Sequence, residues 1–270
     1  MNWTTANIRK LILSILVSLA LLSCATSPTG RSQLQLVSDK QMAEMGASAF
    51  AEIKKETPTA TDPTTRRYVH CVASALTQTL DDSAGWEIEV FQDDSVNAFA
   101  LPGKKIGVFS GLLKVAENQD QLAAVIGHEI AHVLAEHSNA RVSANVATAA
   151  GLQVVEAMIA GQASGAGRQQ AMALLGLGAQ YGVLMPYGRS QEREADVLGL
   201  DIMAEAGFQP EASVALWQNM AHAAGPNPPE LLSTHPSPES RMGDLRKQLP
   251  EANEIYQRAR NQGRRPNCSA

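Results

Sequence analysis

The segment HEIAH at residues 128–132 constrains this chain more than any other feature of its sequence. Histidines four residues apart lie on one face of a helix, about 6 Å from each other. Asn118 with Gln121 is a helix start signal. Apolar residues then recur at helical spacing and predict a buried helix: Leu122, Val125, Ile126, Ile130 and Val133. Buried histidines are costly unless their nitrogens are bound, so the pattern predicts a metal site inside the fold.

Glu129 directly follows the first histidine, and its carboxylate can accept a proton from water that a metal ion activates. Zinc lowers the pKa of such water to about 7. We therefore predict a zinc site with one ion per chain, in which His128 and His132 are ligands and Glu129 is the general base of peptide hydrolysis. A chance occurrence of the pattern is the alternative.

A catalytic zinc takes three protein ligands and keeps one position open, so a third ligand is needed. Glu192 is the best candidate, because it shares a helix face with Asp196 in the segment EREAD at residues 192–196. We expect Glu192 to bind the metal and Asp196 to orient a ligand histidine. Glu194 is expected to point elsewhere, and His137 to face away from the ligands. A solvated charged face is the alternative interpretation of the segment.

With these motifs in place, the chain resembles the zinc peptidase family that includes the CAAX prenyl endopeptidases, HtpX and bacterial envelope members such as LoiP and BepA. The resemblance runs from about Gln33 to Arg246. Four motifs carry it: NAFALPG at 97–103, HEIAH at 128–132, EREAD at 192–196, and His235-Pro236 with Arg241 following.

The family resemblance implies a zincin-like (gluzincin) fold, with Glu192 as third zinc ligand. It also implies that Asn97 and His235 contact substrate near the metal. The strand near residues 106–109 would be a sheet edge that pairs with extended substrate. His235 lies in a Pro-flanked loop, where it could donate to the oxyanion or close over the metal; a surface histidine that caps a turn is the alternative.

Two departures from the family are visible. Relatives usually have Ser four residues before the ligand glutamate, whereas this chain has Gly188, and the lost N-cap would loosen the start of that helix. The chain also lacks the transmembrane helices of the prenyl-protease and HtpX branches. This favours the lipoprotein branch and argues against prenylated substrates.

The N-terminal residues predict export and lipidation. A basic pair, Arg9 and Lys10, precedes an apolar run at 11–22 that would span only about 18 Å as a helix, too short for a transmembrane segment. The following sequence resembles a bacterial lipobox, so residues 1–23 are expected to be removed and Cys24 acylated, with an incidental cysteine as the alternative. Because Ala25 rather than Asp follows, the expected address is the periplasmic face of the outer membrane.

Composition adds two constraints. The two remaining cysteines, Cys71 and Cys268, predict a disulfide in a compartment that permits it, with two reduced thiols as the alternative. The net charge is −5 and there is no long basic run, so the sequence predicts no binding of nucleic acid.

Helical and strand patterns together predict a mainly helical α+β domain over residues 38–250, with a small antiparallel sheet beside the HExxH helix. The sheet is expected to pair residues 86–91 with 105–109. A lipidated tether at 24–37 precedes the domain, and a C-terminal helix with a loose tail follows at 251–270. The Ala- and Gly-rich residues 144–187 predict a lid, with membrane insertion as the alternative.

The sequence therefore predicts a zinc metalloendopeptidase that cleaves unfolded or misassembled envelope proteins. A chaperone-like binder with a latent or structural zinc is one alternative, and a scaffold for the outer-membrane assembly machinery is another. Glu129 discriminates between them, since a structural zinc site has no need of a general base.

Overall fold

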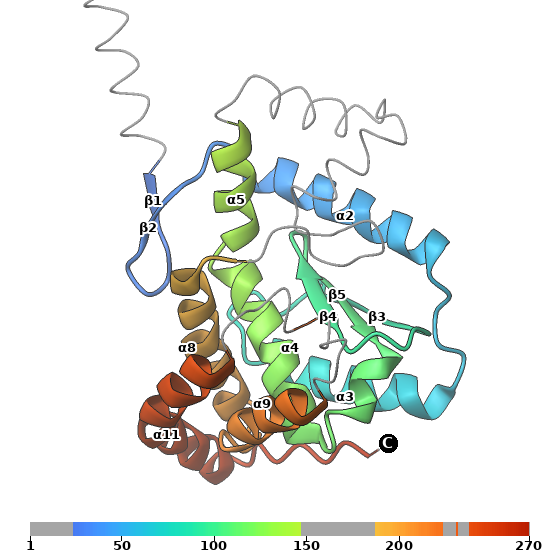
Figure 1. The fold of residues 1–270 in the computed structure, drawn as a ribbon, viewed down its shortest axis with the longest axis vertical. Helices are drawn as coiled ribbons and strands as arrows, with labels where there is room; N and C mark the ends of the chain where they lie inside the picture. The colour runs from blue at the N-terminus through green and yellow to red at the C-terminus, as the bar shows by residue number, and fades with distance from the viewer. Residues whose placement is uncertain (1–23, 147–186, 224–230, 232–237, 270) are drawn as a thin grey trace, which may run out of the picture.

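The computed structural model describes residues 24–146, 187–223, 231 and 238–269. These residues form mainly helices with two small sheets (Figure 1), which confirms the expected α+β class. The helices are α2 (Asp39–Glu56), α3 (Pro63–Thr77), α4 (Gln119–Leu134), α5 (His137–Val146), α8 (Arg189–Glu205), α9 (Ala212–Ala223) and α11 (Pro238–Asn261), with a short 3-10 turn at Ser110–Lys114. Within the described ranges, no helix is both long and apolar enough to cross a membrane.

Local signals in the sequence set several helix ends. Ser38 caps α2 in a capping box with Gln41, and the side chain of Asn118 accepts hydrogen bonds from the backbone N–H groups of Asp120 and Gln121 at the start of α4. Gly207 has φ +86°, a conformation that glycine adopts without strain, directly after α8. The start of α4 agrees with the sequence prediction.

The three-stranded sheet contains β3 (Glu87–Phe91), β4 (Ala98–Leu101) and β5 (Lys105–Phe109) in the order β3-β5-β4. β3 runs parallel to β5, and β4 runs antiparallel to it. The expected antiparallel pairing of 86–91 with 105–109 was therefore wrong. The expected edge strand, 106–109, is in fact central, because β5 pairs with β3 on one side and with β4 on the other. β4 is apolar and buried at every position, so its sequence lacks the alternation that marks a strand.

The sheet separates two apolar clusters. One face, which includes Ile106 and Val108, joins the main core around α4. The other face packs under α2 through a group of phenylalanine rings: Phe50, Phe91, Phe99 and Phe109. Successive strand residues thus serve opposite layers, as the strand period of two requires.

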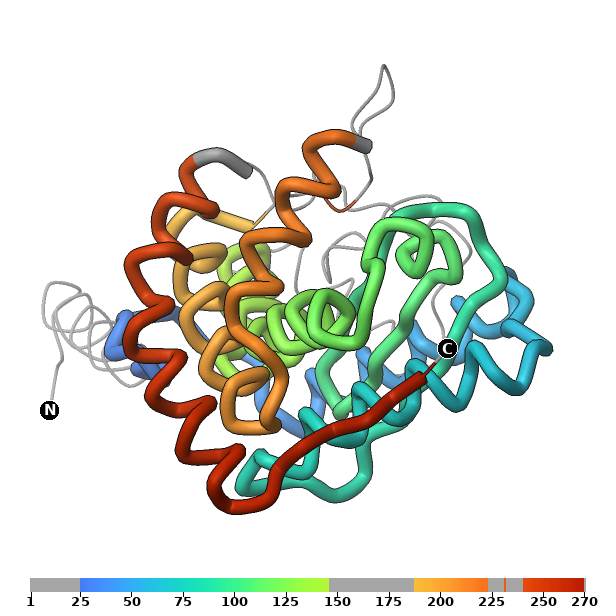
Figure 2. The backbone as a smooth tube through the Cα atoms, turned by 90° about the horizontal axis from the view of Figure 1, so that it is seen from below, coloured from blue at the N-terminus to red at the C-terminus, as the bar shows by residue number. Residues whose placement is uncertain are grey.

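α4 lies at the centre of the molecule. Figure 2 shows it between the helices α8, α9 and α11 on one side and the sheet with α3 on the other. α8 comes closest, because glycines face each other where the two helices cross. A Cβ placed on Gly199 would lie 2.8 Å from the Cα of His128, and one on Gly127 would lie 2.9 Å from the carbonyl oxygen of Gly199. Close packing of α4 and α8 thus fixes the two motif-bearing helices against each other.

The segment expected to be a tether is docked on the domain. β1 (Cys24–Thr26) and β2 (Ser32–Leu34) form an antiparallel hairpin. Beyond the hairpin, Asn139 Nδ2 donates to the carbonyl of Val37 (2.9 Å), and the backbone N–H of Leu36 donates to Ser143 Oγ (2.7 Å). Residues 24–37 are therefore docked on the domain. The residues that hold them on α5 lie more than 100 positions later in the sequence. The expected signal peptide at 1–23 and most of the expected lid, 147–186, lie outside the described residues.

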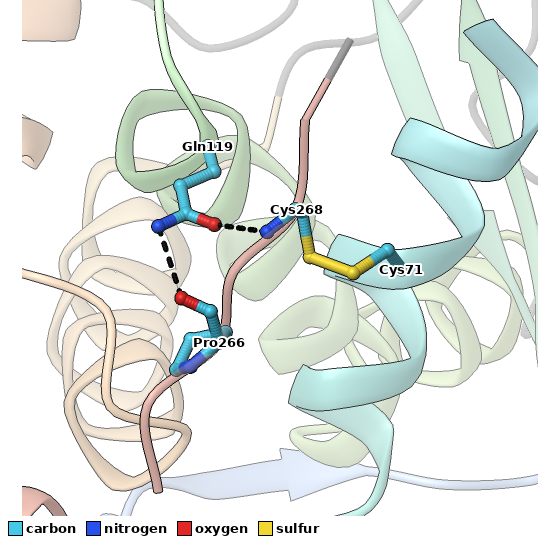
Figure 3. The surroundings of a disulfide bond; sticks show 4 residues. All are labelled: Cys71, Gln119, Pro266 and Cys268. Carbon is cyan, nitrogen blue, oxygen red and sulfur yellow. Dashed lines mark hydrogen bonds between the residues drawn. A yellow bond between two sulfur atoms is a disulfide. The ribbon is translucent and has the colours of Figure 1, made fainter. Parts of the chain in front are cut away.

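The C-terminal tail is also held in place. α11 continues through Pro250 as one helix, across the expected domain boundary at residue 250. The tail then runs back beneath the molecule to α3, where Cys268 is disulfide-bonded to Cys71 (Figure 3). Gln119 binds the same segment, donating to the carbonyl of Pro266 (3.2 Å) and accepting from the N–H of Cys268 (2.8 Å). The expectation of a loose tail was wrong, because Gln119 and the disulfide fix it to α4 and α3.

Candidate metal centre

Three buried side chains from α4 and α8 converge on one point. A nitrogen of His128, a nitrogen of His132 and a carboxylate oxygen of Glu192 all lie within 4.8 Å of one another. The two Nε2 atoms are 3.0 Å apart, and each lies 3.6 Å from an oxygen of Glu192. Glu192 is 1% exposed, so the EREAD segment is no solvated charged face. The two histidines lie together because they are four residues apart on α4, and the carboxylate joins them because α8 crosses α4 at this point.

This donor set fits a divalent metal ion. Burial, and then the positive charge of Arg241, lower the pKa of His128 to about 4, so this imidazole is neutral near pH 7, as a metal ligand must be. Two imidazoles with one carboxylate leave a further coordination position for water or substrate. The residues that would hold the ion are therefore His128, His132 and Glu192.

Asp196 lies beside the first of these histidines, where the sequence placed it. Its Oδ1 is 3.2 Å from Nδ1 of His128. Burial alone would raise the pKa of Asp196, but Arg241, whose Nε donates to Oδ2 at 2.8 Å, holds it well below its usual range. Arg241 also lies 2.9 Å from Glu192 and stacks on Trp217, 3.9 Å from the ring centre. From its sequence motif alone, Arg241 had no predicted contact with either carboxylate.

His137 contacts the metal site, contrary to expectation. Its Nδ1 lies 2.8 Å from Nδ1 of His132, and its Nε2 lies 3.1 Å from Glu194. The error has a clear cause, because α4 ends at Leu134 and Glu136 adopts φ +53°, which turns the chain before α5. Helical periodicity counted across that break points the side chain in the wrong direction.

Glu194 points to the other side of α8 from the metal, as expected, but it is buried there. Burial by itself would raise its pKa, whereas hydrogen bonds from Ser27, Thr29, Arg31 and His137 lower it to about 2. Its carboxylate is thus ionised and fully engaged at neutral pH. The donors from the hairpin, more than 160 residues away in sequence, could not be found from local patterns.

Tyr187 covers the second histidine ligand. Its ring stacks on His132 with the centroids 3.9 Å apart, and the guanidinium of Arg141 lies 3.9 Å from the centre of the same ring. The hydroxyl of Tyr187 is 3.1 Å from Ser138 Oγ. The sequence carried no signal for this residue, which lies in a loop just before α8.

Three of the remaining candidate residues, Glu129, Asn97 and Gly188, are among the described residues, and one, His235, is not. Glu129 is buried on α4 between the two histidines. Asn97 is buried directly before β4, and its Oδ1 accepts from the N–H of Ala98 (2.9 Å). His235 lies outside the described residues, so its role stays a prediction. Gly188 is indeed the N-cap of α8, but Gln191 Oε1 accepts from its N–H (3.1 Å), so the helix start is tied.

The arrangement suits hydrolysis of a peptide bond. A divalent ion bound here would supply a Lewis acid that polarises a carbonyl and lowers the pKa of water. Glu129, next to a ligand and excluded from solvent, is placed to accept the proton that the attacking water gives up and to pass it to the leaving amine. The fold and the site define an HExxH metallopeptidase in which a glutamate on a following helix, Glu192, is placed to be the third ligand.

Comparison with known proteins identifies the family. Residues 60–249 match the profile of peptidase family M48, and the chain belongs to that family. It is 36% identical over 193 residues to the mitochondrial metalloendopeptidase OMA1 of Saccharomyces cerevisiae, covering 68% of this chain and 53% of the relative. It is 30% identical over 223 residues to the beta-barrel assembly-enhancing protease of Escherichia coli K12, covering 80% of this chain and 45% of the relative.

The comparisons place the chain in the family without selecting a branch. The OMA1 of Schizosaccharomyces pombe is 38% identical over 169 residues, covering 62% of this chain and 48% of the relative. The chain thus spans about half the length of the curated relatives it matches. Mitochondrial relatives match as well as bacterial ones, so the expected lipoprotein branch is not singled out.

Proposed function

We propose that this chain is a zinc-dependent endopeptidase of the bacterial envelope that degrades unfolded or misassembled proteins. The observation that carries the proposal is the buried donor set of His128, His132 and Glu192, with Glu129 beside it on the same helix. Two nitrogens and one oxygen, with a position left open, are typical of catalytic zinc, whereas structural zinc sites are closed by four protein ligands. A general base next to the ligands favours catalysis over the alternative of a binder with a latent or structural zinc.

The position of the sheet supports the proposed selection of unfolded substrates. β4 is the outer strand next to α4, the helix that carries both histidines. An extended peptide that added to β4 as a further strand would run past the metal centre with its backbone hydrogen-bonded and its side chains little restricted. Folded proteins do not present such a strand, so an enzyme of this kind prefers unfolded chains. Asn97, directly before β4, is the residue that we propose to contact that substrate.

The proposed location rests on the N-terminal sequence. The charged start, short apolar run and lipobox-like residues before Cys24 support export and anchoring at the periplasmic face of the outer membrane. The name of the Escherichia coli relative, beta-barrel assembly-enhancing protease, supports an envelope role for proteins of this type. Proposed partners are the misassembled envelope proteins themselves and the membrane, through a lipid on Cys24.

The test compares the envelope proteins of cells that carry the wild-type chain with those that carry Glu129→Gln. We expect the variant to bind zinc normally and to stabilise a set of misassembled envelope proteins. Glu254→Gln, on the exposed side of α11, is the matched control and should leave their lifetimes unchanged. An identical set of lifetimes in all three strains would refute the proposed role, and stabilisation in the Glu254→Gln strain would show the effect to be unspecific.

A further inference from the structure

A chain of hydrogen bonds connects the second histidine ligand to the N-terminal hairpin. Nδ1 of His132 lies 2.8 Å from Nδ1 of His137, whose Nε2 lies 3.1 Å from Glu194 Oε2. Arg31 Nε donates to the same oxygen at 2.7 Å, and Thr29 Oγ1 donates to Glu194 Oε1 at 2.6 Å. His137 is 0% exposed and Glu194 5% exposed, so water does not compete for these bonds.

The donor and acceptor of each hydrogen bond in this series follow from which nitrogen of His132 would bind the metal. Nε2 of His132 faces His128 and Glu192, so this nitrogen is the one that would bind the ion and carries no proton. The ring proton of His132 is then on Nδ1 and is donated to Nδ1 of His137. His137 in turn carries its proton on Nε2 and donates it to Glu194. Every donor thus has an acceptor, and His132 is fixed in the tautomer that metal binding requires.

Further hydrogen bonds hold the hairpin in place at its end of this hydrogen-bond series. Arg31 Nη2 donates to Gln33 Oε1 (2.7 Å), and Gln33 Nε2 donates to the carbonyl of Ala135 at the end of α4 (3.0 Å). The turn between the strands is closed by backbone bonds between Ser27 and Arg31 (2.8 Å) and between Gly30 and Ser27 (2.9 Å). The hairpin therefore bridges α4 and α8, the two helices that supply the metal ligands.

From these contacts we infer that His137 and Glu194 are positioning residues for His132. We also infer that the hairpin at residues 24–34 strengthens metal binding, because its residues hold Glu194 in place. This inference rests on the proposed function, because it assumes a metal ion on His132. Asp196 supports His128 from the other side, so each histidine has its own carboxylate-based support. Loss of such a partner typically weakens metal binding by about 10–100-fold.

Zinc affinity, measured by competition with a chromophoric chelator on the purified full chain, tests the inference without any substrate. We expect Arg31→Ala and Glu194→Gln each to weaken zinc binding by about 10–100-fold. In a separate assay of peptide cleavage, both variants should lower kcat with little change in KM. Arg193→Ala is the matched control, because Arg193 is adjacent on α8 and pairs with Asp244 at the surface (3.3 Å). Its zinc affinity should equal that of the wild type.

Unfolding of the metal-free proteins separates positioning from general destabilisation. Arg31 is 25% exposed, so Arg31→Ala should keep most of the stability of the apo-protein while its zinc affinity falls. If Glu194→Gln does not fold, Arg31→Ala combined with Thr29→Val tests the same carboxylate from the hairpin side.

The outcomes distinguish the two proposals. Wild-type zinc affinity in Arg31→Ala and Glu194→Gln would overturn the inference alone, while tight zinc binding without peptide hydrolysis in the wild type would overturn the proposed function alone. A wild-type chain that binds no zinc would overturn both.

Discussion

The closest approach of α4 and α8 gives a quantitative test of how the metal centre is built. Gly199→Ala places a Cβ 2.8 Å from the Cα and N of His128, whereas ordinary contacts begin at 3.4 Å. These neighbours are backbone atoms that cannot rotate away, so the helices must separate locally by about 0.6 Å. Such overpacking costs about 1–3 kcal/mol of folding free energy, offset by up to about 1 kcal/mol from the better helix propensity of alanine.

The same displacement acts on the metal ligands. His128 and His132 belong to α4, and Glu192 lies two turns before Gly199 on α8. Metal–ligand distances tolerate changes of only about 0.2 Å, so a shift of this size between the helices should spoil the donor geometry. We expect zinc affinity to fall by at least about 10-fold, the lower end of what lost ligand support costs.

Two assays with one control check this prediction. Denaturant unfolding of the metal-free protein gives the stability change, and chelator competition gives the zinc affinity. Gly243→Ala on α11 is the control, because a Cβ there meets nothing within 4 Å and should leave both quantities equal or slightly improved. A Gly199→Ala protein with wild-type zinc affinity would refute the claim that this crossing sets the ligand geometry.

Three further predictions concern the C-terminal tail, Asp201 and His235. Cys71→Ser should lower stability by roughly 2–5 kcal/mol, because the bond to Cys268 closes a loop of 197 residues, and denaturant midpoints equal to those of the wild type would contradict this. Burial, followed by the charge of Glu251, raises the pKa of Asp201 to about 6, above the ordinary 3.8, so this group destabilises the fold as pH rises from about 4 past 6. Because the site is partly solvated, Asp201→Asn should add only on the order of 1 kcal/mol at pH 7.5 and nothing at pH 4, and an equal gain at both values would exclude the mechanism. His235→Ala should lower kcat by about 10² to 10³ with zinc retained if it donates to the oxyanion, and raise activity if it occludes the metal; unchanged kinetics would rule out both roles.

Short-range patterns in the sequence located the helix of the metal site. The spacing of His128 and His132, the cap at Asn118 and the apolar face together indicated a buried helix with two imidazoles on one side, and each depends on residues within a few turns. Glu192 could be chosen because its partner Asp196 is one turn away on the same helix. The class of site was therefore readable from local geometry and ligand chemistry.

The supports of the site depended on contacts that no local pattern reveals. His137 was misplaced because the left-handed conformation of Glu136 breaks the helical count. Arg31 reaches Glu194 across the fold, and Gln119 holds the C-terminal tail, so both segments looked loose in sequence. The sheet order failed for a related reason, since a strand buried on both faces, such as β4, lacks alternation.

Glu129 is proposed to be a base beside the metal and not a ligand of it. Glu129→Gln measures this most directly, when the zinc content of the purified variant and its cleavage of an unfolded protein are determined side by side. We expect about one zinc per chain, as in the wild type, with hydrolysis abolished. Loss of zinc from the variant, or hydrolysis at the wild-type rate, would contradict it.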